Sequence, residues 1–242
     1  MTSTIELNST AIARTFDHAL LTPTFTDAEL RKGCEELRAY PIASVCIKPH
    51  AVKMAVEIMA GTVVDVCTVI GFPHGIQLPE VKAFEAECAF RDGAREVDMV
   101  INTGEVLSED WEFVREDVRA VTAVARAHKG IIKVIFETDF VTEDKHKIRL
   151  CEICSEEGVD YVKTSTGFGY VKGQQGGYEY SGATPHDLAL MRKHCAPSVG
   201  VKASGGMRDL DKVLEAFDLG VTRIGTTSTA AIVAEAIQRF GR

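Results

Sequence analysis

The sequence predicts a (β/α)₈ TIM barrel, with eight parallel strands, alternating helices and an extra N-terminal helix. Eight short segments rich in β-branched residues recur along the 242 residues, and segments of helical pattern separate them. No linker rich in Pro, Gly or Ser divides the chain, so we expect residues 1–242 to form a single barrel domain. A doubly wound open sheet is the alternative fold. It is disfavoured because no glycine-rich dinucleotide-binding motif follows the first strand.

The individual elements follow from local patterns. The expected strands cover residues 16–20, 44–48, 63–70, 96–101, 131–136, 161–164, 200–203 and 223–226. A helix over residues 8–15 precedes the first strand. Further helix starts are predicted where a hydroxyl residue precedes acidic residues or proline, at Thr26, Ser108, Thr142 and Thr184.

The composition indicates a compact enzyme of the reducing cytoplasm. With 45% hydrophobic residues the chain can bury a sizeable core, and its net charge of -8 disfavours nucleic-acid or anionic-membrane partners. No apolar run approaches membrane-spanning length, and residues 1–6 lack the pattern of a signal peptide. Seven scattered cysteines, an odd number, fit a reducing compartment better than a disulfide framework. We therefore expect a cytoplasmic protein without membrane or nucleic-acid partners.

Two lysines each lie at a predicted strand end, just before a run of small hydroxyl or glycine residues. Strand alternation turns Lys163 and Lys202 toward the same interior, where a lysine is costly unless it is paired or neutral. One ammonium about 5 Å from another amine, at an effective dielectric of about 20, disfavours the second charge by ~3 kcal/mol. One lysine can thus stay charged and keep its neighbour deprotonated. An enzyme that forms a Schiff base needs this arrangement.

The same alternation predicts a charged cluster inside the barrel, where TIM-barrel enzymes carry their chemistry near the C-terminal strand ends. Its expected members are Asp17, Asp98, Lys133, Glu137, Lys163 and Lys202, with Cys46 nearby. For Lys133 and Glu137 the alternative interpretation is a buried ion-pair network that fixes the barrel register. For Lys163 and Lys202 we favour a functional role, because two further amines carry more positive charge than the single carboxylate of Asp98 could neutralise.

Two glycine and hydroxyl clusters predict a phosphate site. Residues 204–208 follow the seventh strand, and residues 225–228 follow the eighth and open a helix at about Thr229. Barrels of this class bind phosphate in these loops through backbone N–H groups. Ordinary turns are the alternative for either cluster alone.

The pair Cys151-x-x-Cys154 lacks a second Cys or His cluster, so we expect helix packing there and no metal site.

At these residues the chain resembles the deoxyribose-phosphate aldolases, a family of class I Schiff-base aldolases. The matching segments occur in family order along almost the whole chain, at residues 16–20, 45–47, 69–73, 96–102, 162–168, 201–206 and 224–226. The resemblance implies reversible cleavage of 2-deoxy-D-ribose 5-phosphate to D-glyceraldehyde 3-phosphate and acetaldehyde, a step of deoxyribose phosphate catabolism. It also implies that Lys163 forms the Schiff base, that Lys202 activates it, and that Asp98 belongs to the proton relay.

The resemblance further places the members of the predicted substrate-binding set from Gly167 onward on the phosphate side, and the members before Gly167 complete that set. The expected residues are Asp17, Cys46, Lys133, Thr166, Gly167, Gly205, Gly206, Arg208, Gly225, Thr227 and Ser228. No metal or organic cofactor is expected, because the protonated imine is itself the electron sink. The expected ligands are phosphorylated sugars and aldehydes, and the expected assembly is a homo-oligomer, with a dimer favoured.

Three features depart from the family pattern. Ala19 stands where many members carry threonine, and residues 238–242 lack the C-terminal tyrosine that some members fold over the site. Residues 170–181 replace a shorter glycine link. We expect this segment to be a mobile lid with Lys172 near the substrate phosphate; a solvated surface loop is the alternative.

Two other functions remain open from the residues alone. The same barrel and phosphate loops would suit an isomerase that uses Glu137 or Asp98 as general base, with the lysines as electrostatic clamps. A binding barrel without catalysis is the third possibility.

Overall fold

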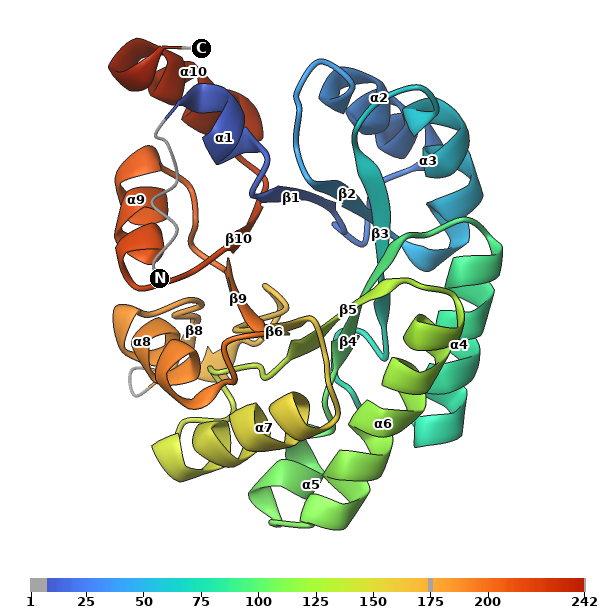
Figure 1. Ribbon diagram of the computed structural model, residues 1–242, viewed down its shortest axis with the longest axis vertical. Coiled ribbons are helices and arrows are strands. Elements are labelled where there is room, and N and C mark those ends of the chain that lie inside the picture. Colours follow the sequence, from blue (N-terminus) through green and yellow to red (C-terminus); the bar gives the residue numbers. More distant parts are fainter. Residues whose placement is uncertain (1–7, 174–175, 242) are drawn as a thin grey trace.

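The computed structural model describes residues 8–173 and 176–241, and it confirms the predicted (β/α)₈ barrel (Figure 1). Eight parallel strands close in the order β1-β10-β9-β6-β5-β4-β3-β2. They are β1 (Phe16–Leu20), β2 (Ser44–Ile47), β3 (Asp65–Ile70), β4 (Glu96–Val100), β5 (Ile131–Ile135), β6 (Tyr161–Lys163), β9 (Gly200–Ser204) and β10 (Arg223–Thr226). Each predicted strand is confirmed to within two residues at either end.

Helices surround the barrel and cover its outer face (Figure 1). They are α1 (Ser9–Ala13), α2 (Asp27–Leu37), α3 (Val52–Met59), α4 (Pro79–Arg91), α5 (Thr103–Leu107), α6 (Trp111–Ala127), α7 (Asp144–Glu156), α8 (Pro185–His194), α9 (Leu210–Asp218) and α10 (Thr229–Phe240), with a 3₁₀ turn at Pro49–Ala51. The first of these is the predicted N-terminal helix, and it packs against α10.

The hydrophobic core lies between the sheet and this ring of helices. On β4, Val97 and Met99 are fully buried in that core, while Asp98 between them faces the barrel interior because successive strand residues alternate in direction. Cys151 and Cys154 of α7 are also fully buried members of the core, which confirms their predicted packing role.

Local capping explains where two helices begin. Thr26 and Glu29 form the predicted capping box of α2, each side chain bonding the other's backbone N–H. The Thr184 hydroxyl accepts from the Asp187 N–H, and Pro185 occupies the first turn of α8, as predicted.

Two other predicted caps are wrong. Ser108 ends the short, unpredicted helix α5, and its hydroxyl donates back to the Gly104 carbonyl. Asp110 caps α6 instead, with its carboxylate accepting from the Phe113 N–H. Helix α7 has Glu143 at its N-cap without a side-chain hydrogen bond, so Thr142 does not cap it. In both cases an acidic residue after the hydroxyl occupies the cap position.

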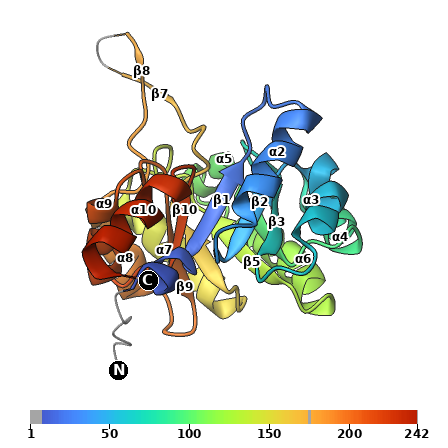
Figure 2. The same cartoon turned by 90° about the horizontal axis from the view of Figure 1, so that it is seen from above.

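A β-hairpin after β6 was not expected. Strands β7 (Val171–Lys172) and β8 (Tyr178–Glu179) pair antiparallel and project away from the barrel (Figure 2). The predicted lid segment includes residues 174–175, which lie outside the described residues.

Among the described residues, no helix has the length and apolar character needed to cross a membrane.

Candidate active site

Asp98 stands at the centre of the barrel interior and contacts three lysines. Its Oδ1 lies 2.8 Å from Lys133 Nζ. Its Oδ2 lies 2.9 Å from Lys163 Nζ and 2.7 Å from Lys202 Nζ. These residues come from four strands, β4, β5, β6 and β9, so barrel closure brings together the amines and the carboxylate that strand alternation predicted.

A second layer of charge lies beside Asp98. Asp17 Oδ2 is 2.5 Å from Lys202 Nζ, and Glu96 Oε2 is 2.5 Å from Lys133 Nζ. Arg223 joins these two carboxylates, at 2.8 Å from Asp17 and 3.3 Å from Glu96. The expected ion-pair role of Lys133 thus has a structural basis in three carboxylate partners.

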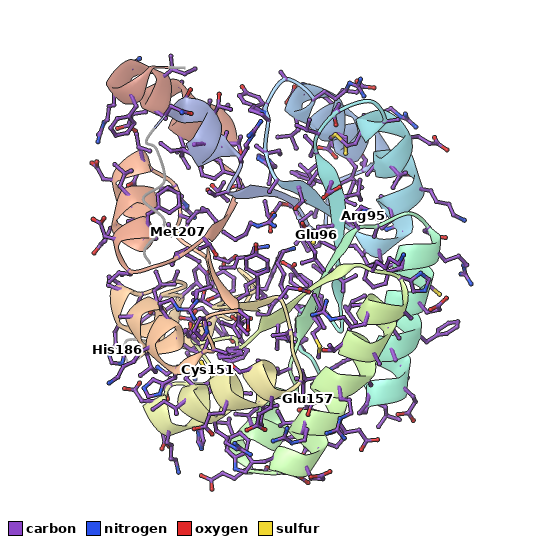
Figure 3. All side chains as sticks on the ribbon, viewed as in Figure 1. Arg95, Glu96, Cys151, Glu157, His186 and Met207 are labelled. Atoms are coloured by element: carbon purple, nitrogen blue, oxygen red, sulfur yellow. The ribbon has the colours of Figure 1, made fainter. Side chains whose placement is uncertain are left out.

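Sequence reasoning missed Glu96 and Arg223. Glu96 had a usable signal, because it precedes Asp98 by two residues and therefore shares its strand face. Side chains crowd the barrel interior in Figure 3, where Glu96 is labelled, and its carboxylate is nearly inaccessible. Arg223 lies opposite Lys202 in the β9–β10 register, a pairing that the sequence does not reveal.

The network contains more basic groups than carboxylates. Its basic members are Lys133, Lys163, Lys202 and Arg223, and its carboxylates are Asp17, Glu96 and Asp98. Charge balance inside the barrel is therefore reached when one basic group is neutral. Lys163 has one carboxylate partner among the described residues. Its side chain is 4% exposed, against 1% for Lys202 and 0% for Lys133, so it is the amine nearest to solvent.

The surrounding charges fix the ionisation of the other groups. Burial opposes the charged form of Asp98, but the three lysines hold its pKa well below the usual value. Burial likewise disfavours charge on Lys202, yet Asp17 and Asp98 raise the pKa of Lys202 above its ordinary range. At neutral pH the site therefore contains the Asp98 carboxylate and the Lys202 ammonium.

Cysteines border this network on the side of β2 and β3. Cys67 Sγ lies 3.3 Å from Asp98 Oδ1 and 3.4 Å from Lys133 Nζ, and the predicted Cys46 is buried beside it. Cys46, Cys67 and Asp98 are close enough together to share a metal ion. The Lys133 and Lys202 ammonium groups that contact Asp98 would, however, repel a divalent cation from this position.

Glu137 is buried but takes no part in the lysine network, contrary to the predicted cluster. Its carboxylate accepts a hydrogen bond from the Thr166 N–H at 3.2 Å and another from the Thr166 hydroxyl. Burial raises the pKa of Glu137 above its usual value. These bonds attach the end of β5 to the loop after β6, and they occupy the carboxylate that an isomerase would need as a free base.

A pocket of about 200 Å³ opens at the C-terminal strand ends, beside the network. The predicted residues that line it are Thr166, Gly167, Gly205, Gly206, Arg208, Gly225 and Thr227. Ser228 lines a neighbouring groove instead, together with His18. A Cβ on Gly225 would lie 3.3 Å from Lys202 Cε, so the pocket adjoins the buried lysines.

The turn after β9 contains two consecutive glycines whose N–H groups face no acceptor in the described part of the chain. Gly205 and Gly206 have φ angles of +93° and +77°, which glycine adopts without steric cost. Neither N–H donates a hydrogen bond within the described part of the chain. Successive free N–H groups in such turns form concave anion sites.

Three other predicted substrate-binding residues lie outside the pocket lining, in the barrel interior: Asp17, Cys46 and Lys133.

Comparisons with known proteins agree with this geometry. A model of the DeoC/LacD family aldolases matches residues 10–226. The deoxyribose-phosphate aldolase of Geobacillus sp. strain WCH70 is 48% identical over 222 residues, covering 92% of this chain and 94% of that protein. Its namesake from Rhodopirellula baltica is 45% identical over 230 residues, covering 95% and 91%.

Solved structures show the same fold. The deoxyribose phosphate aldolase of Aeropyrum pernix, described as a tetramer, superposes with a TM-score of 0.83 at 29% identity, covering 96% of this chain and 92% of that one. An aldolase called QR15 superposes with a TM-score of 0.84 at 34% identity, covering 94% and 96%. The matches extend over nearly the whole barrel and include the strands that carry the lysine network. This chain belongs to the DeoC/LacD family of aldolases.

Proposed function

We propose that this protein is a class I aldolase that reversibly cleaves 2-deoxy-D-ribose 5-phosphate to D-glyceraldehyde 3-phosphate and acetaldehyde. The relatives named above carry this activity in their names, and they match this chain over more than nine-tenths of its length. The observation that carries the proposal is the excess of one basic group over carboxylates around Asp98, with Lys163 as the most accessible amine.

Lys163 is the proposed nucleophile. In its neutral form the amine attacks C1 of the open-chain sugar, and loss of water gives a protonated imine. Asp98 lies 2.9 Å from Lys163 Nζ, within reach of the protons that this step transfers. Lys202 contacts the same carboxylate oxygen. The acid–base groups of Lys163, Asp98 and Lys202 therefore form one hydrogen-bonded cluster.

Carbon–carbon cleavage follows from the imine. A base removes the proton of the C3 hydroxyl, the C2–C3 bond breaks, and its electron pair moves into the protonated imine to give an enamine. The departing fragment is glyceraldehyde 3-phosphate. Protonation of the enamine at its terminal carbon and addition of water then release acetaldehyde and restore Lys163.

Asp98 and Lys202 are the proposed proton relay. Since the pKa of Asp98 is lowered by its lysine partners, it is a carboxylate at neutral pH and can accept a proton. A proton that it delivers must come from an ammonium group in contact with it, and Lys202, whose pKa is raised, is such a donor. Asp17, Lys133 and the buried Cys46 complete the surroundings of this pair.

The pocket beside the network is the proposed substrate site. Gly167, Gly205, Gly206, Gly225 and Thr227 supply backbone N–H groups for the phosphate, with Ser228 at the start of α10 and the Arg208 guanidinium nearby. Thr166 connects this pocket to the end of β6. Ser228 lines the neighbouring groove, so its contribution is proposed through its backbone at the helix start.

Reduction with sodium borohydride in the presence of acetaldehyde tests the reaction class. A Schiff-base aldolase gains a stable ethyl group, which we expect peptide mass mapping to place on Lys163. An isomerase or a binding barrel gains none. Lys163→Ala should abolish both the adduct and turnover, while the exposed hairpin variant Lys172→Ala should retain them. An adduct on Lys202 or Lys133 would contradict the assignment.

The organisation of the chain is also a proposal. We propose one aldolase domain over residues 1–242, located in the cytoplasm, where its free cysteines would stay reduced.

We further propose a homodimer, because several large apolar residues are exposed at the start of α4 and just before it: Ile76, Leu78, Val81 and Phe84. Sedimentation should give twice the 26.3 kDa mass, and Phe84→Glu should lower it; a monomeric wild type would contradict the dimer.

A further inference from the structure

The phenol of Tyr180, at the base of the β7–β8 hairpin, is a buried polar group with an unmet hydrogen bond. Its Oη is inaccessible to solvent and has no hydrogen-bond partner among the described residues. Buried hydroxyl groups without a partner are uncommon, and one that lines a binding pocket has a ligand as a natural partner. Tyr180 lines the same pocket as Gly167, Gly205 and Arg208.

The hydroxyl lies over the turn that we assign to phosphate. A Cβ on Gly205 would overlap Tyr180 Oη, and a Cβ on Gly167 would lie 4.0 Å from it. The phenol oxygen is therefore placed between the loops that follow β6 and β9. Figure 3 labels Met207, which comes two residues after Gly205 and also lines this pocket.

Several contacts hold the phenol in this position. The backbone N–H groups of Ser181 and Gly182 donate to Asp139 at 2.6 and 2.9 Å. The Ala183 N–H donates to the Gly205 carbonyl at 3.2 Å, and the Tyr170 ring packs on that of Tyr180 with centroids 5.5 Å apart. The base of the hairpin is thus attached to the barrel, although strands β7 and β8 project away from it (Figure 2).

We propose that Tyr180 is a substrate-binding residue whose phenol donates a hydrogen bond to the phosphate of the substrate. The phosphate would then be held by the Gly205 and Gly206 N–H groups from one side and by this hydroxyl from the other. Tyr180 would make the enzyme more selective for phosphorylated over unphosphorylated sugars. The inference rests on the proposed function for the identity of the sugar, but the anion site itself does not depend on that function.

The protonation state of the phenol suits this role. Burial raises the pKa of Tyr180 above its usual range, and the nearby carboxylates of Glu137 and Asp139 act in the same direction. The hydroxyl accordingly stays protonated at neutral pH and acts as a donor. A phosphate oxygen is an acceptor only, so the two groups are complementary.

The test compares Tyr180→Phe, which keeps the ring and removes the hydroxyl, with Tyr178→Phe on the same hairpin, whose side chain is 76% exposed. Titration calorimetry with inorganic phosphate measures the anion site without any turnover. We expect Tyr180→Phe to weaken phosphate binding by roughly 10-fold to 100-fold, the effect of one hydrogen bond to a charged group. Tyr178→Phe should bind phosphate like the wild type.

Steady-state kinetics provide the second measurement. With 2-deoxyribose 5-phosphate we expect Tyr180→Phe to raise KM more than it lowers kcat, and to lose much less kcat/KM with unphosphorylated 2-deoxyribose. Unchanged phosphate affinity in Tyr180→Phe, equal losses with both sugars, or a wild type that binds no phosphate would overturn the proposal. If phosphate binding weakens as expected but the wild type cleaves no deoxyribose phosphate, the anion site stands and the proposed reaction fails.

Discussion

Lys163 and Lys202 are register partners in the adjacent parallel strands β6 and β9, and their amines contact the same oxygen of Asp98. Paired positions in neighbouring strands point to the same face of the sheet, so the barrel sets both amines against one carboxylate. The two lysines differ in their second partner. Lys202 also contacts Asp17 at 2.5 Å, and this additional carboxylate favours its charged form.

Lys202→Leu should therefore change the pH dependence of the reaction. Without the Lys202 ammonium, the three carboxylates of the network are balanced only if Lys163 carries the missing positive charge, which removes the nucleophile. We expect kcat to fall at neutral pH and to recover partly in alkali.

The check on Lys202→Leu is a pH–rate profile measured beside Lys172→Leu, a change at an exposed lysine. The surface variant should keep the wild-type profile. A Lys202→Leu profile of unchanged shape would argue against charge as the role of this lysine.

Asp98→Asn should slow proton transfer while leaving the shape of the site nearly intact. The amide cannot accept and return a proton, so we expect imine formation and proton exchange to slow by about 10²-fold to 10⁴-fold. Exchange of the acetaldehyde methyl protons with deuterated water, followed by NMR, reports this step directly. Exchange at close to the wild-type rate would remove Asp98 from the relay.

Strand alternation depends only on local geometry, and it predicted most members of the buried lysine network, but it wrongly included Glu137, whose carboxylate bonds Thr166 instead. It identified Asp98, Lys163 and Lys202 without any pairing information. The contacts of Arg223 with Asp17 and Glu96 depend on how β10 pairs with β9 and, where the barrel closes, with β1, and local strand patterns do not give these pairings. Arg223 was missed for that reason. The hairpin that places Tyr180 was missed because its strands are only two residues long.

Arg223→Met should lower the free energy of unfolding substantially. The change leaves Asp17 and Glu96 buried with one cation fewer, and breaking a buried pair in this way costs about 3–5 kcal/mol. Urea unfolding measures the loss. Arg119→Met removes the more exposed contact with Glu157 and should cost much less. Equal losses in the two variants would contradict a structural role for the buried network.

Gly205→Ala tests the turn after β9 as a phosphate site. The added Cβ would overlap Tyr180 Oη, and the φ of +93° disfavours alanine. We expect KM for 2-deoxyribose 5-phosphate to rise roughly 10-fold, as for one lost hydrogen bond. Gly61→Ala is the matched control, since its φ is +77° but nothing lies within 4 Å of the new Cβ. A similar KM in both variants would contradict the assignment.

Shortening the hairpin separates the role of its tip from that of its base. Lys172 and Tyr178 are exposed and line no part of the pocket, whereas Tyr170 and Tyr180 at the base do line it. Replacing residues 171–179 by two glycines keeps both tyrosines and the anchors to Asp139.

We expect this shortened chain to retain its KM for 2-deoxyribose 5-phosphate and its borohydride adduct on Lys163. The same deletion combined with Tyr180→Phe should raise KM, because only then is the phenol lost. If the shortened chain with Tyr180 intact shows a raised KM and an altered aldehyde preference, the tip itself covers the site, and the lid predicted from the sequence is the better interpretation.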